Sequence, residues 1–187
     1  MDTPFILLLS GPPGAGKTTV GRRVAALTEP SVCLESDWMW TTIVRGHIPP
    51  WDPSADHQNQ AMIRANLAAG VRIADAGYST VVEGVLGPWH WDLVLDELTG
   101  VRAPVHYVVL RPSLDVCLDR ATGRTDERVP DHPALTDPGP IEYMWHQFND
   151  LGAMEQYAFD SSLLDDKDTA SAIGRLLASG AHRVAVP

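Results

Sequence analysis

A glycine-rich stretch near the start of the chain has residue types and spacing that could bind phosphate. The residues GPPGAGKTT, 11–19, follow the apolar run FILLLS and precede a segment with helical character. Glycines let successive backbone N–H groups turn toward an anion, and the start of the following helix adds partial positive charge. Lys17 would reach the terminal phosphates of a nucleotide, and the Thr18 hydroxyl would bind Mg²⁺. The stretch therefore predicts a loop that binds a nucleoside triphosphate.

This stretch matches the pattern G-x-x-x-x-G-K-[ST] at every fixed position. Its context also fits, since an apolar strand is expected before it and a helix after it. The alternative is a glycine-rich turn that binds nothing. We expect the whole loop to contact the nucleotide through Gly11, Pro12, Pro13, Gly14, Ala15, Gly16, Lys17, Thr18 and Thr19.

Two acidic residues stand where predicted strands end. Asp37 follows the strand expected at 32–35, and Glu83 closes the strand in STVVEG. Open α/β sheets bind ligands at the carboxyl ends of their strands, so Asp37 would accept a proton from an acceptor hydroxyl or orient a Mg²⁺-bound water. Its alternative role is to cap the next helix. Glu83 would touch Mg²⁺, contact the substrate, or simply be an exposed acid at a strand end.

Arginines late in the chain are candidates to contact the transferred phosphate. Arg120 and Arg124 are four residues apart on a predicted helix and share one face, and Arg128 follows them. The planar guanidinium suits the negative charge that phosphoryl transfer spreads over oxygen atoms. The alternative is that these arginines pair with nearby acids in solvent. We expect Arg120 and Arg124 to act in catalysis, with Arg120 also contacting the nucleotide.

Tryptophans gather in the two segments that follow the acidic residues. Trp38 comes directly after Asp37, and Trp89 comes shortly after Glu83. The cluster between residues 38 and 91 comprises Trp38, Trp40, Trp51, Trp89 and Trp91. Large rings there would form an apolar wall suited to a flat or partly apolar acceptor. A small polyanion would need more arginines, and these segments offer Arg45 alone. The alternative is that the tryptophans pack helices onto the sheet.

Strand and helix patterns alternate along the chain. Strands are expected at 5–9, 32–35, 80–82, 105–110 and 158–160, and helices at 17–27, 56–76, 89–98, 113–124, 141–151 and 169–178. This alternation predicts a parallel sheet covered by helices on both faces, a three-layer α/β fold. Residues 125–140 are rich in Pro and charge and lack apolar periodicity, so we expect a mobile lid at about 124–140 within a single domain, 1–187.

Composition limits the classes of partner and location. The chain has 187 residues, a net charge of −10 and no dense basic run, so long nucleic acid is not an expected partner. No segment predicts a membrane span or a secretion signal, and Cys33 and Cys117 lie in apolar stretches as free thiols would. These features predict a cytoplasmic protein. The seven histidines lack metal-ligand spacing, although His57 or His90 could line a pocket.

With its loop GPPGAGKTT, its acidic segment CLESDWMW and its later segment RPSLDVCLDRATGR, the chain resembles the small P-loop kinases of metabolites and antibiotics. That group includes shikimate kinase, gluconate kinase and chloramphenicol phosphotransferase, with the zeta toxins as distant relatives. The resemblance implies a P-loop NTPase fold with a five-stranded parallel sheet, an acceptor pocket beside the second and third strands, and an arginine-bearing lid. It also implies that Asp37 is the catalytic aspartate.

These features together predict an ATP-dependent phosphotransferase that uses Mg²⁺ and moves the γ-phosphoryl group to a hydroxyl of a small molecule, with an antibiotic as the first candidate. Asp37, Trp38, Arg45, Glu83 and Trp89 are expected to contact the acceptor. Two alternatives are a nucleic-acid end kinase and a nucleotide-dependent switch without an acceptor. The sequence contains no N-K-x-D run, which disfavours guanine specificity.

Overall fold

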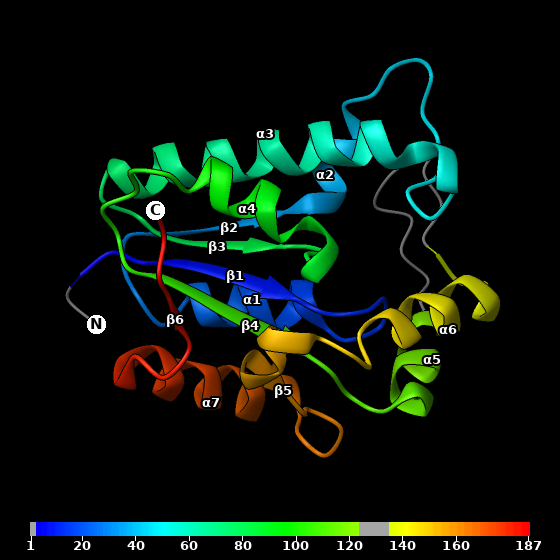
Figure 1. The fold of residues 1–187 in the computed structure, drawn as a ribbon. Helices are drawn as coiled ribbons and strands as arrows, with labels where there is room; N and C mark the ends of the chain where they lie inside the picture. The colour runs from blue at the N-terminus through cyan, green and yellow to red at the C-terminus, as the bar shows by residue number, and fades with distance from the viewer. Residues whose placement is uncertain (1–2, 124–134) are drawn as a thin grey trace.

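The computed structural model describes residues 3–123 and 135–187. Within these residues, a six-stranded sheet has the order β2-β3-β1-β4-β5, and β6 pairs with β4 (Figure 1). The strands are β1 (Ile6–Ser10), β2 (Ser31–Glu35), β3 (Ser79–Glu83), β4 (Val105–Leu110), β5 (Ala158–Phe159) and β6 (Arg183–Val184). The first five strands run parallel, and β6 is antiparallel to the start of β4. The predicted five-stranded parallel sheet is confirmed, with one short strand added.

Helices cover both faces of the sheet. The helices α3 and α4 cover one face of the sheet, and α1 and α7 cover the other; in Figure 1, α3 runs along the top and α7 along the bottom. The helices are α1 (Lys17–Ala25), α2 (Ser36–Thr41), α3 (Asp56–Asp75), α4 (Trp91–Glu97), α5 (Leu114–Thr122), α6 (Pro138–Gln147) and α7 (Asp166–Ser179). Three short 3₁₀ segments are η1 (Pro53–Ala55), η2 (Pro88–His90) and η3 (Gly152–Tyr157). The predicted three-layer architecture is therefore confirmed.

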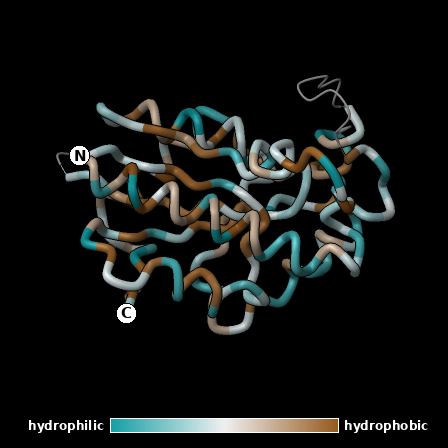
Figure 2. Tube along the Cα trace, turned by 90° about the horizontal axis from the view of Figure 1, so that it is seen from above, coloured by the Kyte–Doolittle hydropathy of each residue, from teal (hydrophilic) through white to brown (hydrophobic). Residues whose placement is uncertain are grey.

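The alternation of side chains along β1 explains why both faces are covered. Ile6 and Leu8 are buried against the layer that contains α3 and α4, whereas Leu7 and Leu9 are buried against α1 and α7. A strand buried on both faces has no polar side, so its sequence is a continuous apolar run. The helices are apolar on one side only, and brown and teal segments accordingly alternate along them in Figure 2.

Several boundaries differ from the sequence expectation because neighbouring segments determine them. The helix expected from Ile141 begins at Pro138, where Asp137 accepts a hydrogen bond of 3.0 Å from the Gly139 backbone N–H. Proline suits this first helical position because its missing N–H would have no partner there. The short helix α2 was not predicted, and it contains Asp37. Among the described residues, no helix has both the length and the apolar character required to cross a membrane.

The predicted lid falls mainly outside the part of the chain that the structure describes. Residues 124–134, which include Arg124 and Arg128, lie outside the described residues. At the far end of the predicted segment, Pro138 begins α6. The lid therefore stays a prediction. Its expected last residues, from Pro138 on, belong to α6.

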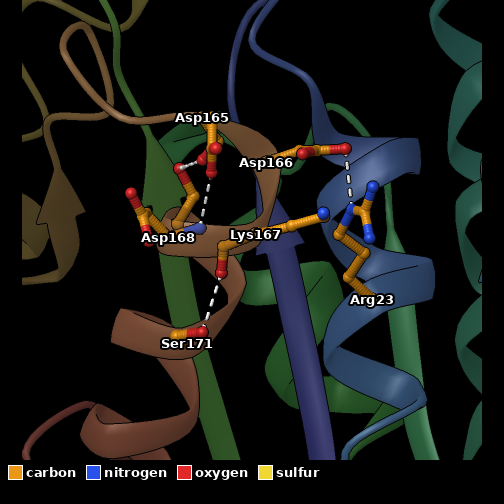
Figure 3. Close-up of polar contacts among 7 residues, drawn as sticks. Arg23, Asp165, Asp166, Lys167, Asp168 and Ser171 are labelled. Atoms are coloured by element: carbon orange, nitrogen blue, oxygen red, sulfur yellow. Dashed lines mark hydrogen bonds and ion pairs between the residues drawn. The ribbon is translucent and has the colours of Figure 1, made fainter.

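Local polar contacts at the start of α7 cap this helix and join it to the neighbouring helix α1 (Figure 3). Asp165 caps this helix by accepting a hydrogen bond of 2.7 Å from the Asp168 backbone N–H. The next residue, Asp166, accepts a hydrogen bond of 2.7 Å from Arg23 of α1. The cap satisfies a backbone donor, whereas the ion pair joins two partly exposed side chains.

Asp165→Ala is therefore expected to lower the free energy of unfolding by about 1 kcal/mol, the usual value of a helix cap. Asp166→Asn keeps the cap and removes the charge of the ion pair, so it should cost less. Urea unfolding of both variants checks this order. An equal or larger loss for Asp166→Asn would contradict it.

Candidate active site

The glycine-rich loop joins β1 to α1 at the carboxyl edge of the sheet. Gly16 has φ +89° and stands directly before α1, in a conformation that other residues rarely adopt. Gly14 has φ +79°, and a Cβ added there would lie 2.1 Å from the carbonyl oxygen of Cys117 in α5. The motif does not fix Gly14, so its second role was not predicted. The missing side chain of Gly14 lets the loop backbone pack directly against α5.

The side chains of Lys17 and Thr18 stand at the first turn of α1. The Lys17 ammonium donates hydrogen bonds of 3.0 Å to the carbonyl oxygens of Gly11 and Pro12. The Thr18 hydroxyl donates a hydrogen bond of 3.0 Å to Oε1 of Glu83, at the end of β3. The loop residue predicted to bind Mg²⁺ and the acid predicted to lie near it are thus in direct contact.

Glu83 is a buried acid, with 2% of its surface exposed. Burial raises the pKa of its carboxyl to about 7, because a charged carboxylate loses the solvation of water. The Lys17 ammonium lowers this pKa, and the Asp37 carboxylate raises it. Glu83 is therefore not the exposed strand-end acid of the sequence alternative, and its charge is coupled to those of Lys17 and Asp37.

The raised pKa predicts how stability changes with pH. The native carboxyl keeps its proton above the ordinary value of 4.5, at which the unfolded chain loses it. The stability that this proton contributes is fully present below pH 4.5 and is lost as the pH rises through about 7.

Glu83→Gln, which is neutral at every pH, should therefore gain on the order of 2 kcal/mol relative to the wild type between about pH 5 and about pH 8. Urea unfolding of both proteins at several pH values measures the difference. Glu29→Gln, an exposed change away from the loop, serves as the control. Parallel pH profiles for the wild type and Glu83→Gln would contradict the assigned pKa.

Asp37 lies in the first turn of α2, two residues after β2 ends at Glu35. This turn approaches β3 closely, since a Cβ added to Gly84 would lie 2.8 Å from the Ser36 hydroxyl oxygen. No side chain caps α2, so the structure gives Asp37 no capping hydrogen bond. Its carboxylate instead lines a cavity at the edge of the sheet.

Arg120 is the catalytic arginine candidate that the described residues include. It projects from α5, and a Cβ added to Gly16 would lie 3.8 Å from its Nη1 atom. Together with Lys17, its charge lowers the pKa of the Cys117 thiol, which burial raises to about 11. Arg120 therefore places a second cation beside the loop. Both cysteines are free thiols.

A cavity of about 370 Å³ opens beside this loop. Its walls come from the ends of β2 and β3, the segment before α3, α3 itself, the turn after β3, and α6. Glu83 lines this cavity and also accepts the hydrogen bond from Thr18, so one side chain connects the loop to the cavity. The volume is within the range of sites that bind small molecules.

The structure brings together some of the predicted acceptor residues. Asp37, Glu83 and Trp89 line the cavity, whereas Trp38 and Arg45 are not among its lining residues. The Trp38 side chain is 60% exposed. Trp51 of the predicted tryptophan cluster also lines the cavity. Sequence reasoning missed other lining residues before and at the start of α3 and in α6, namely Asp52, Asp56, Tyr143, Met144 and Gln147. Trp51 and Asp52 are visible in the sequence just before α3, but the sequence does not show how their segment packs against the sheet.

A parallel sheet, a glycine-rich loop between β1 and α1, and a cavity at the same edge define a kinase-like P-loop fold. The chain belongs to the AAA domain family (AAA_33), whose model matches residues 6–142. This match confirms the resemblance to the small P-loop kinases. Among curated proteins, none matches this sequence significantly.

Solved structures share this fold at low sequence identity. The tunicamycin resistance protein of Deinococcus radiodurans is 18% identical with a TM-score of 0.65, and the match covers 98% of this chain and 99% of that one. Shikimate kinase from Acinetobacter baumannii, in complex with shikimate, is 22% identical with a TM-score of 0.63 and 96% coverage of both chains. A chain of the Pnkp1/Rnl/Hen1 RNA repair complex is 18% identical with a TM-score of 0.56, covering 79% of this chain and 44% of that one.

Proposed function

We propose that the protein is an ATP-dependent phosphotransferase that moves the γ-phosphoryl group to a hydroxyl of a small molecule. The observation that carries this proposal is the position of Glu83, which contacts the loop through Thr18 and also lines the cavity. A hydroxyl compound in that cavity would lie next to a nucleotide on the loop. A switch without an acceptor would need no such cavity beside its phosphates.

The charged groups of the site have separate roles in this reaction. The loop amides and Lys17 would bind the phosphates, and Arg120 would stabilise the negative charge on the transferred group. Asp37 would accept the proton of the acceptor hydroxyl as its oxygen attacks the γ-phosphorus and the bond from that phosphorus to the leaving ADP breaks. Arg124 is proposed to assist Arg120 from the predicted lid.

The contact between Thr18 and Glu83 suits a magnesium ion. A hydroxyl and a carboxylate oxygen 3.0 Å apart are the hard oxygen donors that Mg²⁺ prefers. Thr18 would hold the ion, with Glu83 as a direct or water-mediated partner. When bound, the ion would neutralise charge on the nucleotide phosphates. A divalent cation would also favour the charged form of Glu83 over the neutral form that burial favours.

An antibiotic remains our first candidate acceptor, supported by the aromatic side chains around the cavity and by the shared fold of the tunicamycin resistance protein. Trp38 and Arg45 stay proposed as acceptor contacts, although the cavity lining does not include them. Nucleosides, sugars and nucleotide-sugars remain open. We further propose a single cytoplasmic domain that does not act on long nucleic acid.

An ATP-consumption screen against a panel of hydroxyl compounds tests the proposed function. Lys17→Ala provides the blank, since it removes the ammonium from the loop. Consumption that depends on one acceptor and occurs only in the wild type would support phosphotransfer. Equal rates with and without every acceptor would identify a simple ATPase and contradict the proposal.

A nucleic-acid end kinase is the second candidate, because a chain of an RNA repair complex shares the fold. The net charge of −10 argues against it, since a phosphate backbone would be repelled without a local cationic groove. Labelling of oligonucleotide ends with radioactive ATP distinguishes this candidate from the small-molecule kinase.

A further inference from the structure

The cavity beside the loop is acidic. Four carboxyl groups line it, from Asp37, Asp52, Asp56 and Glu83, and no lysine or arginine is among its described lining residues. His90 is the one basic side chain in this lining, and burial lowers its imidazole pKa. The described wall of the cavity therefore offers an acceptor negative charge and no permanent positive charge.

Aromatic rings line the same cavity, and several are held in place by specific contacts. The Trp40 indole N–H donates a hydrogen bond of 3.1 Å to Asn59 on α3. The Trp89 ring packs edge-on against Phe148, with ring centroids 5.3 Å apart, and covers Gly87, where an added Cβ would lie 2.3 Å from the ring. Trp51 and Tyr143 add further rings, both of them exposed. Aromatic faces attract organic cations through the negative charge above the ring.

Two of the four acids are not used by the proposed reaction. Asp37 and Glu83 face the loop side of the cavity, whereas Asp52 and Asp56 flank η1 at the start of α3. Asp52 accepts hydrogen bonds of 2.8 Å and 2.6 Å from the backbone N–H and the hydroxyl of Ser54, which lower its pKa. Asp56 accepts a hydrogen bond of 2.8 Å from the Gln60 amide. These contacts keep the Asp52 carboxylate charged and leave other oxygens of both acids for a ligand.

Building on the proposed function, we propose that the acceptor carries a cationic amine as well as its hydroxyl, on a flat or apolar body. The aromatic rings that line the cavity would cover that body. Asp52 and Asp56 would bind the amine. The hydroxyl would then lie toward Asp37. The same lining disfavours carboxylate-bearing or phosphorylated acceptors, because their charge would face four acids.

Three ligands that share a benzylic hydroxyl and carry a cationic, a neutral or an anionic group in the para position test this proposal. They are para-(aminomethyl)benzyl alcohol, the neutral para-benzenedimethanol and para-(hydroxymethyl)benzoate. Binding to the 187-residue chain is followed by tryptophan fluorescence, because Trp40, Trp51 and Trp89 line the cavity. We expect the amine to bind about tenfold more tightly than the neutral diol, and the benzoate to bind most weakly.

The double variant Asp52→Asn/Asp56→Asn assigns this preference to the two acids. Asparagine keeps the hydrogen-bond acceptors that cap the local turns, so the segment should stay folded. Affinity for the amine should fall about tenfold, while affinity for the diol should stay within about twofold. Asp75→Asn, at the other end of α3 and outside the cavity, is the matched control and should leave amine binding unchanged.

Benzoate binding as tight as amine binding, no detectable amine binding, or a preference for the amine that survives in the double variant would each overturn the proposal. These readouts need no catalysis, so they are separate from a failure of the proposed kinase activity. Transfer of phosphate to neutral or anionic alcohols, with amines rejected, would overturn the amine proposal and leave the kinase intact.

Discussion

Lys17→Ala is expected to lower acceptor-dependent ATP consumption by about 10²–10³-fold. The ammonium is the one lysine charge at the loop, and its loss removes a donor to the phosphate oxygens on which negative charge develops. The rate is measured at saturating acceptor over a range of ATP concentrations. Thermal unfolding of the variant must show that it is folded, since Lys17 also donates hydrogen bonds to two loop carbonyls.

The chain contains a matched control for this change. Lys167 is the only other lysine, and it lies on α7 near the ion pair between Arg23 and Asp166 (Figure 3). Lys167→Ala removes the same charge from the chain without touching the loop, so its activity should match the wild type. Similar activity in Lys17→Ala and Lys167→Ala would show that Lys17 does not contribute to the reaction.

Asp37→Asn is expected to lower the rate of transfer by about 10²–10⁴-fold while ATP binding is retained. The asparagine keeps the size of the side chain but cannot accept the proton of the acceptor hydroxyl. Single-turnover transfer measures the chemical step, and a fluorescent nucleotide measures binding. Asp92→Asn, in the first turn of α4 and outside the cavity lining, is the control and should behave as the wild type does.

The result for Asp37 also separates the proposed kinase from its main alternative. A nucleotide-dependent switch without an acceptor has no hydroxyl to deprotonate, so its turnover should be unchanged in Asp37→Asn. Unchanged turnover would therefore contradict the catalytic role of Asp37 and favour the switch.

Local signals predicted the loop that we propose binds phosphate. This loop is one continuous stretch of sequence that contains the glycines and Lys17 and directly follows the apolar run of β1. Its conformation could be predicted because it depends mainly on neighbouring residues. The two-residue strand β6 was missed because it exists only through pairing with the start of β4. The start of α6 at Pro138 was missed because residues 125–140 lack apolar periodicity and were assigned to the lid, whereas Asp137 caps a helix that begins at Pro138.

The cavity was harder to predict because its wall is assembled from distant segments. Asp37 and Glu83 were found because each follows a strand, and parallel strands end at one edge. Asp52 precedes α3 and Asp56 is its first residue, and both have the sequence character of helix caps. Only the packing of α3 against β3 reveals that they line the cavity. Trp51, a member of the predicted tryptophan cluster, is also a lining residue.

The most direct test of the account is a calorimetric titration of magnesium-ATP into the purified 187-residue chain at two temperatures. We expect one site per chain with a dissociation constant between about 1 μM and 1 mM, the usual range for enzyme substrates, and much weaker binding by Lys17→Ala. If the folded wild-type protein releases or absorbs no heat of binding at either temperature, the loop does not bind nucleotide, and the proposed reaction is wrong.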